Sequence, residues 1–484
     1  MAIVEPHFRY VYRIHPGIGV ARIGNSQAAR DDGYFIGPEV PDIQFSPPGG
    51  TYRDVSNNIR RQGVRFRIYE HTIPGNVVRE ITAEDAEIEW HVHLANRKSH
   101  DGAGHPVPND PGEKTIGGLQ QSLDIVGTVF GASVQLATLK TDDKGHLILL
   151  GGFGKSASPR HLPITGLYSR GWYDDVSDGS VRATIKMKRT EARPAVEPAW
   201  VIVGVPRFAE PVSAIVTMYD LAYDVATKLP PPYTLIPPAT VSFTRDIYPV
   251  LFRAVMMQWV ISTARTGHSG AAGGNFLNHA LFDLLKDNDP APGSPARLAR
   301  EHVNSRLRPI GNMPDLAASL QLTDTQLAHF KKWAAGDFLA DWMAPPVVKP
   351  FSALTPLEQT QTLDMTGLWT AVGGAFSPGI EASSVMSQPA TYQQPFRINP
   401  ALPPGTLTGA LSIPWQADYR ACGLSWWPSG RPDEVTKDGT NFYEWIPNSM
   451  TQEQLVQDWW KLGFLAQKMV AGNDIYVEQE RLLP

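Results

Sequence analysis

The sequence predicts an α+β fold with a β-rich N-terminal half, a helical middle section, and irregular β structure plus short helices in the C-terminal region. Alternating apolar and polar residues gather in the first 210 residues, and helical spacing begins near residue 217. Glycine and proline, at 42 residues each, are spread along the chain and indicate many turns. We therefore divide the 484 residues into a β-rich region at 1–215, a mainly helical region at 216–345 and a C-terminal region at 346–484.

The N-terminal half contains a series of segments with strand character. The segment 8–26 predicts a strand, a turn and a second strand, because an apolar and aromatic stretch is followed by closely spaced glycines. Two segments alternate regularly, at 64–70 and 86–94, and predict half-buried strands. Further strands are predicted at 146–150, 181–187 and 200–205.

The predicted helices lie in the middle and C-terminal regions. Apolar spacing predicts helices at 217–228 and 246–263. Thr323 is a good N-cap, and Gln326 completes a capping box for a helix that runs to about residue 335. The other predicted segments are a loose stretch at 267–296, a proline-bearing link at 345–357, a helix at 355–364, irregular β structure at 370–450 and a last helix near 451–468.

Composition excludes several classes of function. Hydrophobic residues (42%) and charged residues (19%) are at the levels of an ordinary globular protein. The 43 basic and 48 acidic residues give a net charge of −5, which offers no attraction for nucleic acid or an anionic membrane. No apolar run approaches the roughly 18 residues of a spanning helix, and the N-terminus lacks the layout of a signal peptide. We expect a cytoplasmic protein without nucleic-acid or membrane partners, although export without a signal peptide is compatible with the same sequence.

Three motifs have a second interpretation as ligand sites. The glycine-rich segment 151–156 follows a strand as a phosphate loop does, but its spacing is wrong, and a tight turn is favoured. The segment 172–179 gathers three carboxylates as a calcium site does, but it lacks the calcium-loop spacing, and an Asx-type turn is favoured. His91 and His93 share one face of a strand, but no third ligand is evident, and a polar strand face is favoured. We therefore expect no bound metal.

Cys422 is the only cysteine of the chain, so it cannot form an internal disulfide. It is a free buried thiol, a nucleophile, or a sulfur joined to another side chain. Trp426 and Trp427 follow it closely, and Asp418 lies four residues before it. From chemistry alone, a small buried residue among core aromatic rings is favoured over a thioether to an oxidised indole. None of the 13 histidines lies beyond His329, so carboxylates are the leading acid–base candidates in the C-terminal third.

Several motifs follow one another in a characteristic order along the whole chain. The segments that carry this pattern are 12–26, 149–154, 172–179, 198–201, 373–381, 414–433 and 459–464. In this order they resemble the family of L-lysine ε-oxidase and glycine oxidase that carries cysteine tryptophylquinone. The segment 414–433 matches the family pattern closely.

The resemblance implies a cofactor made from the chain itself. In that family a cysteine sulfur is bonded to a tryptophan indole that is oxidised to an ortho-quinone. This implies that Cys422 is joined to Trp459, with Trp460 as the adjacent rival. Asp418 matches a family aspartate that assists indole oxidation and acid–base steps, so the resemblance implies Cys422, Trp459 and Asp418 as the catalytic residues.

The implied reaction is the oxidative deamination of a primary amine of an amino acid or a related amine. Dioxygen is the acceptor, and hydrogen peroxide, ammonia and an aldehyde or keto acid are the products. The expected partners are the small-molecule amine, a flavoprotein maturation enzyme and further copies of the chain in a homo-oligomer. Two alternatives are a quinone-free relative that acts as a binding or structural protein, and a specialised biosynthetic oxidase with the same cofactor.

Overall fold

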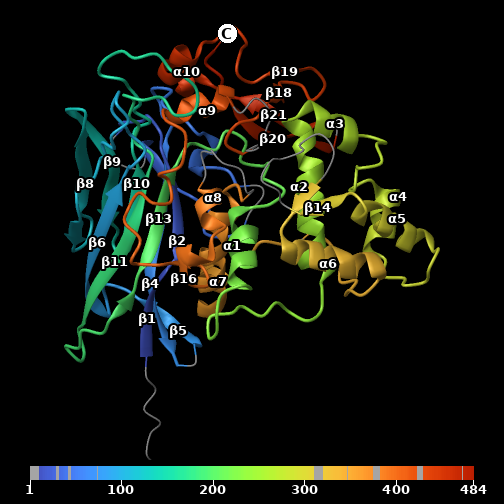
Figure 1. The fold of residues 1–484 in the computed structure, drawn as a ribbon. Helices are drawn as coiled ribbons and strands as arrows, with labels where there is room; N and C mark the ends of the chain where they lie inside the picture. The colour runs from blue at the N-terminus through green and yellow to red at the C-terminus, as the bar shows by residue number, and fades with distance from the viewer. Residues whose placement is uncertain are drawn as a thin grey trace, which may run out of the picture.

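The computed structural model describes most of the chain. The described residues are 10–28, 32–41, 45–73, 75–309, 320–345, 347–373, 382–421, 429–470 and 472–483. The fold is α+β, as predicted, with a β-rich first half, helices in the middle, and short helices and strands towards the C-terminus (Figure 1). The division of the chain at residues 215 and 345 stays a prediction.

One large sheet occupies the N-terminal half. Its strands are β1 (Tyr10–His15), β2 (Ile18–Arg22), β3 (Tyr34–Ile36), β4 (Arg61–Thr72), β5 (Val77–Ile81), β6 (Ala86–Ala95), β7 (Lys114–Gly117), β8 (Ser122–Val129), β9 (Ala132–Thr141), β10 (Leu147–Gly151), β11 (Ser177–Met187), β12 (Val196–Glu197) and β13 (Ala199–Gly204). Nine of them follow the order β7-β6-β11-β13-β2-β4-β10-β9-β8, and β1, β3 and β5 pair with β4 while β12 pairs with β1. Because β7 also contacts β8 and β9, the sheet is nearly closed.

The predicted strands of the first half are confirmed, and their side-chain patterns explain the sheet. Along β6, Trp90, Val92 and Leu94 are buried, whereas His91 and His93 between them are only partly buried. The strands β2, β10 and β13 are buried along their whole length, which is typical of strands covered on both faces. The hairpin of β8 and β9 was not predicted from the sequence.

Outside the large sheet, the described residues include ten α-helices and four small strand pairs. The helices are α1 (Met218–Ala226), α2 (Tyr248–Met256), α3 (Ser262–His268), α4 (His279–Lys286), α5 (Pro295–Asn304), α6 (Asp324–Ala335), α7 (Pro356–Trp369), α8 (Ser383–Met386), α9 (Trp415–Ala421) and α10 (Gln452–Asp458). The strand pairs are β14 (Leu307–Pro309) with β15 (Leu320–Leu322), β16 (Tyr392–Gln394) with β17 (Arg397–Ile398), β18 (Glu434–Thr436) with β19 (Phe442–Glu444), and β20 (Phe464–Val470) with β21 (Asn473–Gln479). None of the helices in the described ranges combines the length and apolarity needed to cross a membrane.

Three helix predictions need correction. The predicted helix 246–263 is broken at Val260, whose carbonyl accepts hydrogen bonds from the amides of Asp433 (3.0 Å) and Glu434 (3.1 Å). The stretch 267–296 is not loose throughout, because it contains α4 and the start of α5, whose apolar side chains pack into the core of the middle region. The prediction of a last helix at 451–468 is wrong after residue 458, where a 3-10 turn at Trp459–Lys461 leads into the β20–β21 hairpin.

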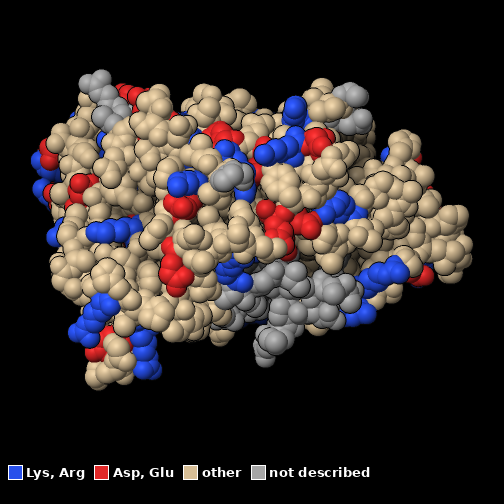
Figure 2. Space-filling view, turned by 90° about the horizontal axis from the view of Figure 1, so that it is seen from above, with Lys and Arg blue, Asp and Glu red and all other residues tan. Residues whose placement is uncertain are grey.

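Three hydrophobic clusters hold these elements together. The largest joins the sheet to aromatic residues of the C-terminal region, among them Trp415, Tyr419 and Trp459. A second lies within the middle helices and includes Phe330 and Trp333, and a third packs α1 and α7 against β2 and β13. Figure 1 accordingly shows α9 and α10 above one end of the sheet, with α4, α5 and α6 on the far side of the molecule. On the face seen from above in Figure 2, acidic and basic side chains are interspersed.

Candidate active site

The predicted site residues lie where the C-terminal region covers one end of the sheet. Asp418 is on α9, and its side chain is fully buried. Trp459 begins the 3-10 turn after α10 and is 3% exposed. The helices α9 and α10 pack against each other. Cys422, together with Trp426 and Trp427, lies outside the described residues.

A buried ion pair anchors the start of α9 to the sheet. Lys98 Nζ lies 2.6 Å from Asp174 Oδ2, and both side chains are almost completely buried. Lys98 also donates to the Ser412 carbonyl (2.9 Å), and the same Asp174 oxygen accepts the backbone N–H of Trp415 (3.1 Å). Since Pro414 precedes α9 and cannot donate, the chain enters the helix with its first free amide already bonded. The position of Asp418 is therefore fixed from outside its own helix.

The Trp459 indole is enclosed by an aromatic ring and a glycine turn. The rings of Trp415 and Trp459 meet edge to face, with centroids 5.2 Å apart and an interplanar angle of 73°. On another side, a Cβ atom built on Gly154 would overlap Cζ2 of Trp459 and lie 2.9 Å from its Cε2 and Cη2. Gly154 has φ of +73°, which glycine adopts without strain. Any other residue at position 154 would displace the indole.

Trp460, the rival of Trp459, has a different environment. It is only partly buried, and its Nε1 donates to the Gln457 carbonyl in the preceding helical turn (3.1 Å). The ammonium of Lys461 lies 5.4 Å from its ring centroid. Trp460 thus lies at the rim of the core, whereas Trp459 lies inside it beside the Asp418 helix.

A second buried carboxyl group lies against the glycine-containing segment that packs on Trp459. Asp175 is fully buried, and its Oδ2 accepts the backbone N–H of Lys155 (3.1 Å) in the turn that contains Gly154. Its Oδ1 is buried and has no hydrogen-bond partner among the residues that the structure describes. Burial, followed by the nearby charge of Asp174, raises the pKa of Asp175 to about 7. The group therefore changes its protonation near neutral pH.

Two further polar atoms, both on α9, are buried in the same way. The Nε1 of Trp415 and the Nε2 of Gln416 have no hydrogen-bond partner within the described ranges. Gln416 is held through its other terminal atom, because Ser156 donates to its Oε1 (2.8 Å). Unpartnered buried polar atoms are uncommon and costly, so the start of α9, which contacts the Trp459 indole through Trp415, is a candidate place for a bound polar group.

The motifs with two interpretations can now be placed. Gly151 ends β10, and the connection from Gly152 to Ser156, to which no regular turn is assigned, packs on Trp459 through Gly154. In the segment 172–179, Asp174 Oδ1 accepts the amide of Val176 (3.3 Å) as in an Asx turn, but its three carboxylates are buried and not in a surface loop. His91 and His93 bond to strand hydroxyls and to Asp110. Among the described residues no group of three potential ligands could hold a metal ion.

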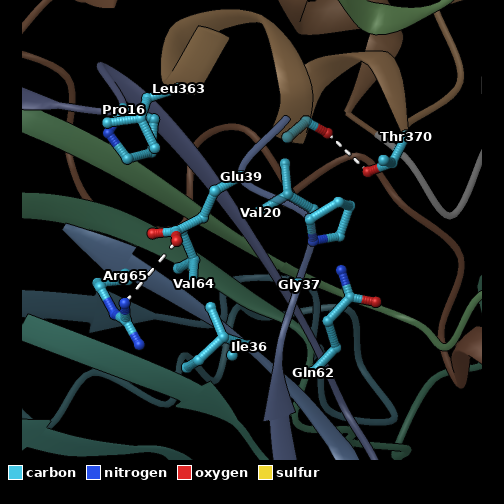
Figure 3. A pocket seen from close by; sticks show the side chains of 13 residues that line it. Pro16, Val20, Ile36, Gly37, Glu39, Gln62, Val64, Arg65, Leu363 and Thr370 are labelled. Atoms are coloured by element: carbon cyan, nitrogen blue, oxygen red, sulfur yellow. Dashed lines mark hydrogen bonds and ion pairs between the residues drawn. The ribbon is translucent and has the colours of Figure 1, made fainter. Parts of the chain in front are cut away.

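A small hollow of about 30 Å³ lies elsewhere, between α7 and the strands β2, β3 and β4 (Figure 3). Its lining includes Pro16, Val20 and Leu363, together with Glu39 and Arg65, whose charged groups are 3.8 Å apart. No predicted site residue lines it. Its aliphatic walls and single ion pair describe a packing gap between helix and sheet.

Sequence reasoning missed three residues of the site, namely Gly154, Asp175 and Trp415. The signals were present, because a glycine cluster at a strand end indicates a close backbone approach, and paired carboxylates in an apolar stretch indicate buried anchors. Such signals do not show which residues lie opposite. The contacts with Trp459 come from another part of the sequence, so no local pattern could reveal them.

Comparisons with known proteins extend the resemblance found in the sequence. The family model of the L-lysine epsilon oxidase N-terminal domain matches residues 15–104 and 103–203, and that of its C-terminal domain matches residues 307–460. The L-lysine 6-oxidase of Marinomonas mediterranea is 26% identical over 548 residues, covering 85% of this chain and 71% of that protein.

Solved structures of the same bacterial protein share the fold. The structure of the epsilon-lysine oxidase from Marinomonas mediterranea superposes with a TM-score of 0.75 at 20% identity, over 97% of this chain and 95% of that one. The structure of its Schiff base intermediate with L-Lys gives a TM-score of 0.74 at 20% identity, over 98% and 95% of the two chains. The two family models together span more than half of the sequence, and the chain belongs to the L-lysine ε-oxidase family.

Proposed function

We propose that this protein is an amine oxidoreductase that removes the amino group of an amino acid or related primary amine through a cysteine tryptophylquinone formed from Cys422 and Trp459. In the overall reaction the amine, dioxygen and water give an aldehyde or keto acid, ammonia and hydrogen peroxide. The activity of the L-lysine 6-oxidase relative supports a small primary amine as the substrate. The acceptor and the cofactor follow from the family resemblance.

One observation carries the proposal. The indole of Trp459 lies inside the core and contacts Trp415, the first residue of the helix that carries Asp418. The two motifs are separated in sequence, and Cys422 follows directly after the same helix. Trp459 thus contacts the helix that carries a buried carboxyl group and that ends, in the sequence, directly before the only cysteine.

The described residues fit such a cofactor. Gly154 provides a cradle that any side chain would fill, and Trp415 and Gln416 present buried polar atoms without partners in the described part of the chain. Trp459 and Cys422 would form the group, and these neighbours would hold it. When formed, a tryptophylquinone supplies an electrophilic carbonyl group and accepts two electrons.

Asp418 is assigned as the base that takes the proton from the carbon beside the amine. Its side chain is fully buried, and so are those of Trp415 and Tyr419 on the same helix, whose rings meet edge to face with centroids 5.3 Å apart. None of the histidines of the chain lies beyond His329, so a carboxylate is the leading candidate for acid–base work in the C-terminal third. The Asp174–Lys98 pair keeps α9, and with it Asp418, in place.

Peptide mass mapping of mature protein tests the proposal. The Cys422 and Trp459 peptides are expected to be joined, with two oxygen atoms gained and four hydrogens lost, and the protein is expected to absorb visible light. Cys422→Ser should abolish both signals, and Trp460→Phe should preserve them. A free, alkylatable Cys422 in catalytically active protein would overturn the cofactor, and a link at Trp460 would correct only the partner.

Maturation is expected to need a flavoprotein partner, as the family resemblance implies. Oxidation of an indole to a quinone requires an oxidant, and nothing in the sequence resembles a flavin-binding or haem-binding motif. Protein expressed without the partner should be colourless and inactive. Full quinone content in purified protein that never met a partner would contradict this dependence and leave the cofactor assignment intact.

A further inference from the structure

We propose that Asp175 and Gly154 are positioning residues of the quinone site: the Asp175 carboxyl group anchors the turn 152–155, and Gly154 in that turn fixes the orientation in which the Trp459 ring is oxidised and cross-linked. The inference rests on the proposed function, because it assumes that Trp459 is the modified tryptophan. Neither residue is next to Cys422 in the sequence, and neither belongs to α9, the helix that carries Asp418.

The contact between Gly154 and Trp459 involves the part of the indole where the chemistry takes place. The atoms nearest to a Cβ at position 154 are Cζ2, Cε2 and Cη2, all in the six-membered ring. That ring has four carbons that carry hydrogen. An ortho-quinone together with a thioether replaces three of these hydrogens, so at least one of Cζ2 and Cη2 must receive a new atom. In every possible arrangement, therefore, at least one of the two ring carbons that lie against Gly154 is substituted.

Asp175 connects this turn to the sheet. Its Oδ2 accepts the Lys155 amide (3.1 Å), and a Cβ at Gly152 would overlap the same oxygen. The carboxyl group thus touches the turn on both sides of Gly154. Phe153 of the same turn stacks on the guanidinium of Arg61 (4.4 Å), which steadies the turn from its outer side.

The arrangement does more than satisfy a backbone donor. One oxygen of Asp175 suffices for the Lys155 amide, and the other is buried without a partner in the described part of the chain. Lys98, the cation of this junction, is already paired with Asp174 (2.6 Å) and does not neutralise Asp175. A buried carboxyl group with one oxygen left over is costly for a purely structural element. Burial raises the pKa of Asp175 to about 7, so the spare oxygen can carry a proton at neutral pH.

Two matched pairs of variants, each matured with the partner flavoprotein, test the inference. Gly154→Ala is compared with Gly131→Ala, because Gly131 has a similar φ (+79°) and nothing within 4 Å of its Cβ position. Asp175→Asn is compared with Asp178→Asn. Asp178 is another buried carboxylate, three residues further on in β11, and it accepts hydrogen bonds from Trp200, Leu407 and Thr408. The readouts are the fraction of joined Cys422–Trp459 peptide, the position of the quinone absorption band, and the thermal midpoint.

The expected result separates the members of each pair. Gly154→Ala should leave most of the Trp459 peptide unjoined, while Gly131→Ala keeps the wild-type fraction. Asp175→Asn should lower the joined fraction and shift the absorption band, while Asp178→Asn lowers only the thermal midpoint. If Gly154→Ala does not fold, the Asp175 pair decides alone.

Equal effects of Asp175→Asn and Asp178→Asn on the joined fraction, or a wild-type fraction and band in Asp175→Asn, would overturn the inference. If the wild-type protein itself lacks the joined peptide, the proposed function has failed, and the two failures are therefore distinguishable.

Discussion

The middle helical region and the C-terminal region are built on different principles, although both are mainly composed of short elements. The middle region has its own hydrophobic cluster, formed by residues such as Phe243, Phe330 and Trp333. The aromatic residues of the C-terminal region, including Trp415 and Trp459, belong instead to the cluster of the sheet. The candidate site is therefore shared between two distant parts of the chain, whereas α4, α5 and α6 of the middle region pack in a cluster formed within that region.

The two regions also differ in how they stabilise polar groups. In the middle region, helix ends are satisfied locally, for example by the capping box of Thr323 and Gln326. At the candidate site, the start of α9 depends on Asp174, which is far away in the sequence and is itself neutralised by Lys98. A change at the site should therefore affect chemistry and stability together, and a change in the middle region should affect stability alone.

The largest expected effect is that of Asp418→Asn. The amide has the same shape as the carboxyl group but cannot accept the substrate proton, and loss of a general base typically lowers the rate by about 10²–10⁴-fold. Quinone content is measured from the absorption spectrum, and the reduction rate per quinone by anaerobic mixing with the amine.

The control for this variant is Asp458→Asn, which changes a partly exposed carboxylate next to Trp459 that pairs with Lys461. It should leave both quantities unchanged. Normal quinone content together with a normal reduction rate in Asp418→Asn would remove Asp418 from the mechanism.

Lys98→Met should produce the next largest effect. It leaves the Asp174 carboxylate buried without its cation, and breaking a buried pair in this way costs about 3–5 kcal/mol of unfolding free energy. Arg182→Met removes the exposed partner of Glu113 on the outer face of the sheet and should cost less than about 1 kcal/mol. Urea unfolding of both variants measures the difference, and similar losses would show that the junction at α9 is no more sensitive than the surface.

Asp175 should give the site a dependence of stability on pH. Its pKa is raised from 3.8 to about 7, so the folded protein holds this proton at pH values where the unfolded chain has released it. The stabilisation is fully present below about pH 4, falls as the pH rises, and is lost above about pH 7. Between about pH 5 and pH 8 the wild type should lose up to ~3 kcal/mol relative to Asp175→Asn.

The comparison with Asp175→Asn isolates this group from other titrating residues. The buried His15 and His71, whose pKa values burial lowers, act in both proteins and cancel in the difference. Unfolding midpoints in urea at the two pH values are sufficient for the measurement. A constant difference between the two proteins would show that Asp175 keeps the same protonation state throughout.

The parts of the fold that depend on local patterns could be predicted from the sequence. Regular alternation identified β6, and a threonine with a glutamine three residues later identified the start of α6. The break at Val260 was not predictable, because its carbonyl accepts hydrogen bonds from the amides of Asp433 and Glu434, which lie far away in the sequence. Likewise, the helical pattern after Asp458 is overridden by the pairing of β20 with β21.

In the candidate site, too, local patterns predict some residues and long-range contacts determine others. Asp418 and Trp459 could be proposed from the sequence because their motifs are local and resemble a family pattern, and their roles stay predictions. Gly154 and Asp175 were interpreted only as turn residues, because the indole that contacts Gly154 lies in a segment hundreds of residues away. Long-range packing assigns these residues a role that their sequence neighbours do not reveal.

The smallest expected effect gives the sharpest comparison of the two regions, because the same substitution can be made in each. Thr323 caps α6 in the middle region and Thr451 caps α10 before Trp459, and each forms a capping box with a glutamine. Replacement of either threonine by alanine should cost about 1 kcal/mol of unfolding free energy.

The two variants should nevertheless differ in their chemistry. Loss of the Thr451 cap loosens the helix whose last turn positions Trp459 between Gly154 and Trp415, so Thr451→Ala should lower quinone content or the reduction rate per quinone. Thr323→Ala should lower the thermal midpoint by a similar amount and leave both quantities at the wild-type value, because α6 packs in a separate cluster. Equal loss of quinone in both variants would mean that overall stability controls maturation, and that the site does not depend on its local scaffold in the way argued above.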